Sequence, residues 1–468
     1  MTRSSSRMVL LLGLLALAVT LITFSMTLHW PDKGSYLAAM LPLGLVVIFL
    51  SMTYPQLVML ALVALIPLDT FAYLSDFTQM LTLMKVLFPF ALVGLLLGRL
   101  VNRFEAPSPH PIDWWVLLWI GLNALLIINA VDTEAALTFV RRLISMGLFY
   151  YVLSRVFSNP QWHKRLQATL IYSAAISVGF GLFAYISGQN PFMEGYEFDA
   201  VRITGASHIS PNRYSIMLLL PMMLAASTIF NATSLKRQSI NIGLVLLFIT
   251  GIALSFSRSG FLAFAVTAVL ALILWRNRIS ARQWIGITAI LIMTLPFLPT
   301  EFWQRIGSLN VFGKDAVVEE SLSGRLNYIR VGKNIVQTYP LLGAGPGNFK
   351  VLHSMAEFQT IPTMIGVQRL PHNVYLQTVT ETGLVGLTVL LGMLASVFMC
   401  ALKAFRASVN ISLLAGALLL ALCGYMIMGL FAHLMLNKYL WVLFAMIRTL
   451  PELNRYESKA NHTDLPAA

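Results

Sequence analysis

Apolar stretches of about twenty residues recur along this chain from Met8 almost to its C-terminal end. That is the length a helix needs to cross the hydrocarbon core of a bilayer. Backbone inside lipid must satisfy its own hydrogen bonds, and the stretches lack the alternation of barrel strands, so each is predicted to be a transmembrane helix. With 57% hydrophobic and only 11% charged residues, the composition excludes a soluble domain of this length. The sequence therefore predicts an all-α, polytopic helical membrane protein.

The apolar stretches predict about 12–14 transmembrane helices, which form one membrane domain over residues 1–450 and leave residues 451–468 as a cytoplasmic tail. The first stretch follows Arg3 and Arg7 and could be mistaken for an export signal. It is longer than a signal core and no small-residue cleavage site follows it, so we expect a retained span. The last two stretches could also form one long, broken helix. The expected spans are residues 8–28, 37–53, 56–73, 80–98, 114–131, 136–157, 166–186, 214–230, 240–256, 261–275, 284–299, 376–402, 411–430 and 433–449.

The net charge of +13 does not indicate a nucleic-acid partner, because the basic residues flank or separate the apolar stretches. When the spans are counted, every basic cluster falls on the same side of the membrane, which is the positive-inside bias. Both termini are therefore predicted to be cytoplasmic, and membrane lipids are the expected surroundings. The clusters are Arg3 and Arg7, Arg99 and Arg103, Lys164 and Arg165, Lys236 and Arg237, Arg276 with Arg278 and Arg282, Lys403 and Arg406, and Arg448 with Arg455 and Lys459.

Two substantial loops are predicted on the opposite, periplasmic side, over residues 187–213 and 300–373. The second is too long for a mere connection, and loops of that length usually carry function. Within it, residues 321–339 are predicted to form a helix that a serine-rich start caps and Pro340 ends. We expect this helix to lie at headgroup level on the membrane face, with Arg325 and Lys333 near its apolar side. The residues expected on that side are Leu322, Leu326, Ile329 and Val336.

Outside the second loop, five arginines lie on the periplasmic side, against the positive-inside bias: Arg141 and Arg142 near the outer end of the sixth span, Arg202 and Arg213 in the first loop, and Arg258 in the short turn 255–260. Each could be an interfacial arginine that extends to lipid headgroups. Arg258 has no loop to extend into, so its guanidinium must be held among helix ends. Fixed arginines at a membrane face suit a bound diphosphate, because each guanidinium can grip two oxygens and stays charged. The diphosphates expected at that depth are lipid-linked.

His372 is the first candidate for catalysis. It lies in the tripeptide Pro371–Asn373, where the second loop gives way to the apolar run 384–402. A neutral imidazole, with an ordinary pKa of about 6.5, can accept a proton at neutral pH. The alternative is a surface histidine at a helix entrance. Asn373 is expected to shape the turn.

Arg325 and Glu381 are supporting candidates. Glu381 stands at the entrance to the run 384–402, where burial is costly without a partner, and an ionised Glu381 could raise the pKa of His372. Residues 343–347 superficially resemble a phosphate-binding loop, but no GK[ST] follows, so an ordinary turn is expected. The two cysteines lie in apolar stretches and indicate neither a disulfide nor a metal site.

Six short motifs carry most of these candidates. They are Arg202-Ile-Thr-Gly205 followed by Pro211-Asn212, then Ser255-Phe-Ser-Arg-Ser-Gly260, Ser323-Gly-Arg325, Tyr339-Pro-Leu-Leu-Gly-Ala-Gly-Pro-Gly-Asn-Phe349, His372-Asn-Val-Tyr-Leu-Gln377 and Glu381-Thr-Gly383. In this order and spacing, the motifs resemble those of the O-antigen ligase/polymerase superfamily of bacterial inner-membrane glycan transferases. The resemblance is firm across about residues 200–400 and is only a general likeness in helix count before them.

The resemblance implies glycosyl transfer from an undecaprenyl-diphosphate-linked glycan at the outer face of the inner membrane, without a metal or cofactor. The acceptor is lipid A-core in ligases and another lipid-linked repeat unit in polymerases. The functional histidine of the family corresponds to His372, and its diphosphate-binding arginines correspond to Arg202 and Arg258. A single displacement would invert the anomeric centre. The diphosphate leaving group needs positive charge rather than a proton donor, and arginines supply that positive charge.

Other functions remain open at this stage. A multi-span solute transporter fits the composition equally well, although the polar groups cluster at one face and no inverted repeat is evident. An accessory scaffold is a further alternative. Within the superfamily, the sequence does not distinguish a ligase from a polymerase or from a protein-directed transferase.

Overall fold

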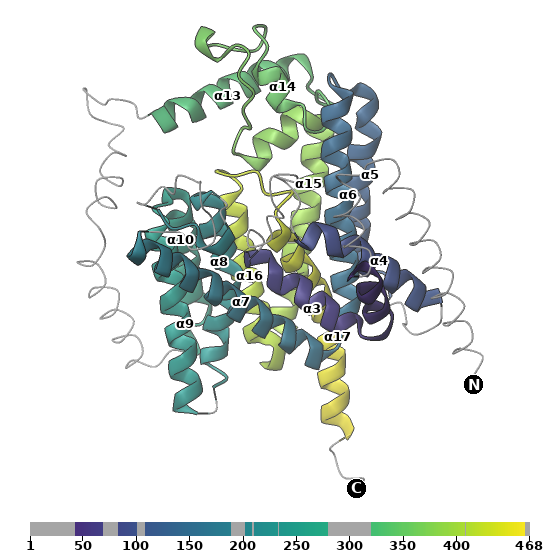
Figure 1. Cartoon of the computed structure of the whole chain (residues 1–468), viewed down its shortest axis with the longest axis vertical. Coiled ribbons are helices and arrows are strands. Elements are labelled where there is room, and N and C mark those ends of the chain that lie inside the picture. Colours follow the sequence, from purple (N-terminus) through teal and green to yellow (C-terminus); the bar gives the residue numbers. More distant parts are fainter. Residues whose placement is uncertain are drawn as a thin grey trace. The chain divides into compact units, whose positions relative to one another are not determined.

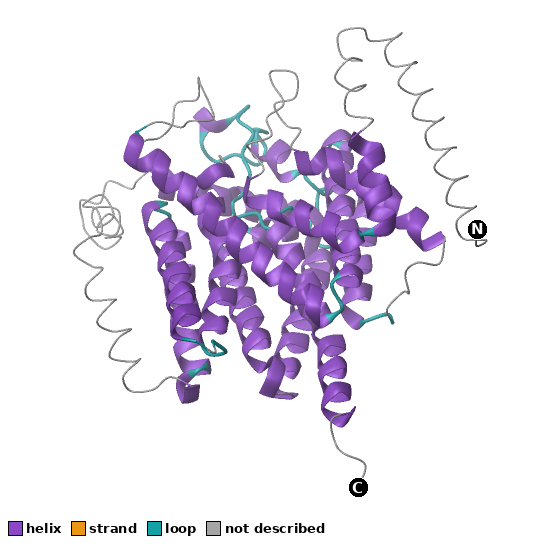
Figure 2. Ribbon diagram, turned by 60° about the horizontal axis from the view of Figure 1, so that its bottom comes forward, coloured by secondary structure: helices purple, strands orange, loops and turns teal. Residues whose placement is uncertain are grey.

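The computed structural model describes residues 43–68, 83–100, 108–188, 202–207, 210–232, 234–278, 320–407 and 409–463. Within these ranges the chain consists of helices and loops, without strands (Figure 2). Six of the described helices are long and apolar enough to cross a membrane, which confirms the all-α, multi-pass class. These six are Pro111–Asn129, Thr133–Val156, Pro160–Ser187, Leu235–Leu254, Val374–Ala407 and Ile411–Met428. The expected spans 8–28 and 284–299 lie outside the described residues.

The chain divides into two compact units, of which the first comprises Met1–Ser108 and Arg155–Ser173. Its described part includes the short apolar helix Leu43–Thr53, followed by α3 (Pro55–Leu65), η1 (Ile66–Leu68) and α4 (Leu83–Leu100). Gly94 lets α4 approach the first of these helices closely, because a Cβ there would stand 2.4 Å from the carbonyl oxygen of Ile48.

The second unit, Pro109–Ser154 with Ala174–Ala468, holds the candidate site. Its central helix is α16 (Val409–Met428), and 78% of its apolar stretch Ile411–Met428 is buried within the protein. Such a helix can be apolar all round because its neighbours cover every side. The neighbours of α16 are α8 (Pro211–Ile229), α10 (Arg258–Leu274), α15 (Val374–Ala407) and α17 (Lys438–Thr463) (Figure 1).

The remaining membrane helices of this unit are more peripheral. In α9 (Leu235–Leu254), which packs on α8, only 22% of the apolar stretch is buried within the protein. In α5 (Pro111–Leu125) with η2 (Leu126–Asn129), which packs on α15, the buried share is 28%. Apolar faces left uncovered in this way are suited to lipid. The residues of α6 (Thr133–Val156) and of α7 (Pro160–Ser187) are divided between the two units.

α16 and α17 are separate helices, joined by a loop over residues 429–437, so the alternative of one long broken helix is wrong. α17 continues through Pro451 to Thr463 and so extends into the predicted tail. It also carries Arg448, whose buried guanidinium lies 3.4 Å from Asp113 Oδ2 of α5 and pairs with Glu452. Arg448 was counted with Arg455 and Lys459 as a charge that flanks an apolar stretch. In the structure it instead makes an ion pair between helices inside the protein.

α15 contains a break at Gly383, whose φ of 66° and ψ of −167° are not helical. The segment 340–349 packs against this break and replaces the missing helical hydrogen bonds. The N–H groups of Leu384 and Val385 donate to the carbonyls of Pro340 and Leu341 at 3.0 and 3.2 Å. The first turns of α15 are thereby fixed to the large loop, and the candidate site lies at the start of these turns.

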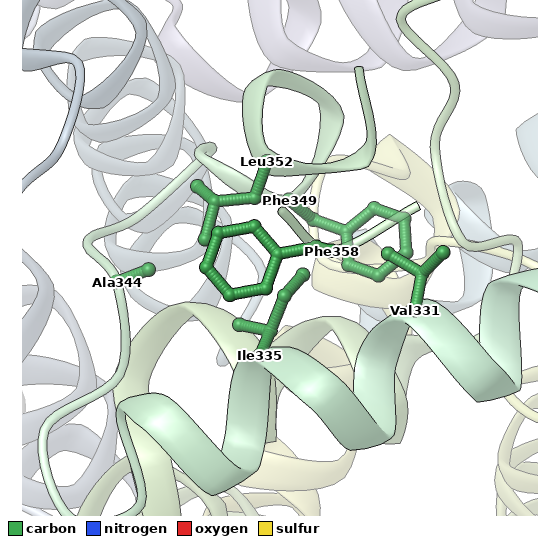
Figure 3. Close-up of a cluster of buried hydrophobic side chains, with 6 residues drawn as sticks. All are labelled: Val331, Ile335, Ala344, Phe349, Leu352 and Phe358. Carbon is green, nitrogen blue, oxygen red and sulfur yellow. The ribbon is translucent and has the colours of Figure 1, made fainter. Parts of the chain in front are cut away.

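The large loop contains the predicted helix as α13 (Glu320–Thr338), and the short α14 (Phe349–His353) follows it. Both lie across the end of the second unit at which α15 begins (Figure 1). The loop has a hydrophobic core of its own, shown in Figure 3. Its buried members are Val331, Ile335, Ala344, Phe349, Leu352 and Phe358.

The predicted apolar side of α13, which was expected to face the membrane, is not the side that packs against the loop core. Val331 and Ile335 are the residues that face the loop core, whereas Leu326 and Ile329 are 44% and 55% exposed. The core that α13 covers is made by residues 344–358, so its buried face follows that partner rather than the leucines of the helix itself. The expected position at headgroup level is not tested by these contacts.

Basic residues and candidate site residues occupy opposite ends of the same helices. α10 starts with Arg258 and is followed by Arg276 at its other end. α15 starts directly after His372 and Asn373 and carries Arg406 in its last turn. This arrangement is the one that the positive-inside bias requires, and the orientation of the helices in the membrane stays a prediction.

Candidate active site

His372 occupies a tight turn at the start of α15. Its φ of 47° is in the left-handed region, where histidine is tolerated better than most residues with a side chain. Asn373 caps the helix, because its Oδ1 accepts hydrogen bonds from the N–H groups of Tyr375 and Leu376, both at 2.9 Å. This agrees with the predicted turn-shaping role of Asn373. A third bond, from Val374 N to the carbonyl of Gly429 at 2.7 Å, ties the turn to the end of α16.

Two aromatic rings flank the imidazole of His372. The ring of Tyr328 on α13 lies on one side with centroids 6.1 Å apart, and the ring of His433 from the α16–α17 loop lies at 5.4 Å. Tyr328 is itself supported by His353, at 5.4 Å. His353 is buried and its Nδ1 lies 2.8 Å from the carbonyl of Val367, so His353 is part of the loop framework.

The charges around His372 are those of arginines. Partial burial of the imidazole is the largest cause that lowers the pKa of His372, and the positive charges of Arg325, Arg213 and Arg369 lower it further. The expectation that Glu381 would raise this pKa is wrong. The imidazole is therefore neutral at neutral pH, which is the form that can accept a proton.

Arg213, in the first turn of α8, contacts His433 directly through Nη2 and the ring Nε2. A guanidinium can only donate, so Nε2 must be the acceptor and the ring proton must reside on Nδ1. The same environment lowers the pKa of His433 to about 3, first through burial and then through the charges of Arg213 and His372. His433 is therefore a neutral acceptor at any physiological pH.

Arg202 and the turn that carries Arg258 lie together. The Nε of Arg202 donates to the carbonyl of Ser255 at 3.1 Å, and the N–H of Ile203 donates to that of Leu254 at 3.0 Å. The predicted loop 187–213 is described only in part, and within that part its segment 202–207 is fixed to the end of α9. Arg202 is thus held by the backbone next to Arg258.

α8 and α10 are joined at their N-terminal ends. Ser257 caps α10 by accepting from the N–H of Gly260 at 3.1 Å, and its hydroxyl donates to Asn212 Oδ1 at 2.7 Å. Gly260 permits the close approach, since a Cβ there would stand 2.2 Å from Ser215 Oγ. Arg213 and Arg258 each follow one partner of the Asn212–Ser257 bond in sequence, so the two arginines extend from neighbouring helix ends.

Arg325 approaches the site from α13. Its guanidinium carbon lies 5.7 Å from the ring centre of Phe431, a cation–π contact with the loop that also carries His433. The structure thus brings Arg202, Arg213, Arg258, Arg325 and His372 to one end of the helices.

Glu381 has a structural partner instead. It is 2% exposed, and its carboxylate accepts from the N–H groups of Gly347 at 2.8 Å and Phe349 at 3.3 Å. Gln377 adds a side-chain donor at 3.2 Å. Residues 343–347 form the expected turn, with positive φ at Gly343, Gly345 and Gly347. Glu381 therefore holds this glycine turn against α15 and does not contact His372.

Arg141 and Arg142 lie two turns into α6 with exposed side chains. In the described part of the chain, no hydrogen bond or ion pair joins them to the other candidates. Among the described residues there is also no group of three or more His, Cys, Asp or Glu that could hold a metal ion. Metal independence and the supporting role of these two arginines stay predictions.

The sequence did not point to His433 or Tyr328. His433 is the first residue of the expected span 433–449, and the uncertainty about the break before this span was the available signal. Tyr328 lies within the predicted helix 321–339, on a face that was not assigned a partner.

These features define the class of the protein: a multi-pass helical membrane protein with a cationic, histidine-containing site at one end of its helices. Residues 243–391 match the model of the family described as O-Antigen ligase. Over this stretch the match supports the predicted resemblance to the O-antigen ligase/polymerase superfamily. The family indicates a glycosyltransferase-like enzyme that acts on lipid-linked glycan and polysaccharide substrates in a membrane. No match was found among curated proteins.

The matched stretch contains Arg258, Arg325 and His372, and also the glycine turn with Glu381. Arg202, Arg213 and His433 lie outside it. The contacts described above are what connect these three residues to the family domain.

Proposed function

We propose that this protein transfers a glycan from an undecaprenyl-diphosphate-linked donor to a sugar hydroxyl at the periplasmic face of the bacterial inner membrane. The acceptor we propose is lipid A-core, so that the enzyme is a ligase of O-antigen or another surface polysaccharide. One observation carries the proposal: a neutral histidine, His372, lies at the same end of the helices as four arginines that come from separate segments. These arginines are Arg202, Arg213, Arg258 and Arg325.

His372 is proposed as the general base. The acceptor hydroxyl loses its proton to the imidazole as its oxygen forms a bond to the anomeric carbon. The bond from that carbon to the diphosphate oxygen breaks with its electron pair, and the diphosphate leaves. A single displacement of this kind inverts the anomeric centre. General-base assistance is typically worth about 10²–10⁴-fold in rate.

Arg202 and Arg258 are proposed to bind the diphosphate. The bond from Nε to the carbonyl of Ser255 fixes the guanidinium of Arg202 beside the turn of Arg258, and a guanidinium can grip two phosphate oxygens in a bidentate manner. Arg258 is the first residue of α10, so the partial positive charge of the helix N-terminus adds to its own. These groups stabilise the charge that develops on the leaving diphosphate, and no metal is required for this step.

The location of the site supports the proposed membrane orientation. The candidate residues occupy the helix ends opposite the basic clusters, which the positive-inside bias assigns to the cytoplasm. A periplasmic site is also where a lipid-linked glycan meets lipid A-core.

Surface polysaccharide from a deletion strain tests the proposal. Loss of all polymer linked to lipid A, with polymer still present on its lipid carrier, is the expected result. A lipid A-core capped by a single repeat unit would instead assign the chain as a polymerase, and an unchanged pattern would contradict both. Complementation with wild type and with His372→Ala, at equal membrane levels, separates loss of chemistry from loss of protein.

A further inference from the structure

We propose that His433 is a positioning residue of the reaction, which holds the guanidinium of Arg213 in place beside His372. No sequence motif marked His433, and the matched family region ends before it. The catalytic purpose of this arrangement rests on the proposed function. The contacts of His433 do not depend on that function.

Two contacts of His433 carry the inference. On one side its Nε2 accepts from Arg213 Nη2, and on the other its ring packs on His372 with centroids 5.4 Å apart. His433 therefore connects α8 to the turn that begins α15. Its backbone is fixed too, since the loop that carries it is bonded to the turn through Val374 and Gly429.

Arg213 needs such a partner. Its side chain is long and exposed, so without a fixed acceptor it would sample many rotamers. A carboxylate in the place of His433 would neutralise Arg213 and weaken its hold on a diphosphate. A neutral imidazole fixes one nitrogen of the guanidinium and leaves its charge and its other N–H donors for a ligand.

The placement of Arg213 has a measurable effect on His372. The groups that face His372 are Arg213 from α8, Arg325 and Tyr328 from α13, Arg369 from the preceding loop, and His433 itself. Each arginine disfavours protonation of the imidazole. If Arg213 is released from His433, its charge moves away and the pKa of His372 rises.

The pH dependence of His372 modification by diethyl pyrocarbonate tests the inference. This reagent attacks the neutral imidazole, and mass spectrometry of the peptide that contains His372 gives the midpoint without any need for glycosyl transfer. Two substitutions separate the effect of the ring from the effect of the hydrogen bond. His433→Phe keeps a ring against His372 but cannot accept a hydrogen bond from Arg213, whereas His433→Gln keeps a hydrogen-bond acceptor. We expect His433→Phe to raise the midpoint, by up to the order of one pH unit, and His433→Gln to leave it near the wild-type value.

Arg213→Gln completes the cycle. It should raise the midpoint as much as His433→Phe does, and adding His433→Phe to it should have little further effect. An unchanged midpoint in His433→Phe would overturn the inference. So would an equal shift in the Arg213→Gln background, because His433 would then act through solvation alone. Size-exclusion profiles of the detergent-solubilised variants identify a misfolded one. If His433→Phe is misfolded, His433→Gln and Arg213→Gln decide: a shifted midpoint in the first, or an unchanged midpoint in the second, would overturn the inference.

Transfer assays on the same variants separate this inference from the proposed function. With the proposed function correct, His433→Phe should raise the KM for the lipid-linked donor and move the acid limb of the rate profile upward, and His433→Gln should restore both. If the modification midpoints shift as expected but wild type transfers no glycan, the positioning role stands and the proposed reaction fails.

Discussion

His372 combines a reactive side chain with an unfavourable backbone. A non-glycine residue at φ 47° costs free energy that the surrounding structure must offset, and such residues concentrate at functional sites. Here the offset comes from the Asn373 cap and from the rings of Tyr328 and His433. The same surroundings hold the imidazole neutral. The backbone and the protonation state of His372 are thus set by the same few neighbours.

The pH dependence of the reaction follows from these neighbours. The pKa of His372 is lowered, so the acid limb of the rate profile should have its midpoint below the ordinary value of about 6.5. Replacing Arg325 by Gln removes one of the charges that lower this pKa and should move the limb to higher pH. Initial rates from pH 4.5 to 8 check this. A limb that moves to lower pH, or stays in place, would mean that Arg325 does not act on the titrating group.

Arg258 can be tested by a change that keeps its charge. Arg258→Lys retains the positive charge but loses the bidentate fork, so transfer should drop severely while the protein remains inserted. Arg258→Ala should be at least as damaging. Arg276→Lys is the matched control, since Arg276 follows the other end of α10 and is exposed. Normal transfer by Arg258→Ala at limiting donor would show that this arginine merely contacts lipid headgroups.

At the scale of elements, the site depends on the break in α15. Gly383 has φ 66°, and a Cβ there would stand 2.1 Å from the carbonyl oxygen of Leu341. Gly383→Ala must therefore push the segment 340–349 away from α15. We expect a loss of stability of about 1–3 kcal/mol or more, measured as a lower thermal transition in detergent. Gly121→Ala on α5 meets no atom within 4 Å and should be neutral or slightly stabilising. Equal transitions for the two variants would contradict this account of the break.

Most helices could be predicted from the sequence because hydrophobic length in lipid is a strong signal. The break at Gly383 could not, since it lies in an apolar run whose composition favours a continuous helix. The face of α13 that packs against the loop core could not be predicted, because its partner is built from residues 344–358 and no periodicity within the helix reveals it. Glu381 could be recognised as an expensive buried group, but its partners are backbone N–H groups of a distant turn.

At the scale of the whole molecule, the sequence indicated candidate residues but not the neighbours that surround them. Arg202 and Arg258 were selected because basic residues are unexpected on that side of a membrane, and the structure places them on adjoining segments. His433 could not be found in the same way, because a neutral histidine inside an apolar stretch violates no rule. Its importance appears only when α8, α15 and the α16–α17 loop are brought together.

Membrane orientation is the whole-molecule prediction. In a variant without Cys400 and Cys423, we expect Thr363→Cys to react with an impermeant maleimide in intact spheroplasts. Ser458→Cys should react only after the membrane is permeabilised. Both positions are exposed, so a difference in labelling reports the side of the membrane rather than burial. Labelling in the opposite sense would place His372 in the cytoplasm and would contradict the proposed function as well.

The central claim is that His372 accepts the proton of the acceptor hydroxyl while arginines hold the donor diphosphate. Donor affinity and transfer rate, measured separately in purified and reconstituted His372→Ala, test it most directly. We expect the rate to fall by about 10²–10⁴-fold and the acid limb to disappear, with the affinity for the lipid-linked donor unchanged. A rate and an acid limb that both survive would place the base elsewhere, and a collapse of affinity alone would make His372 a ligand of the donor.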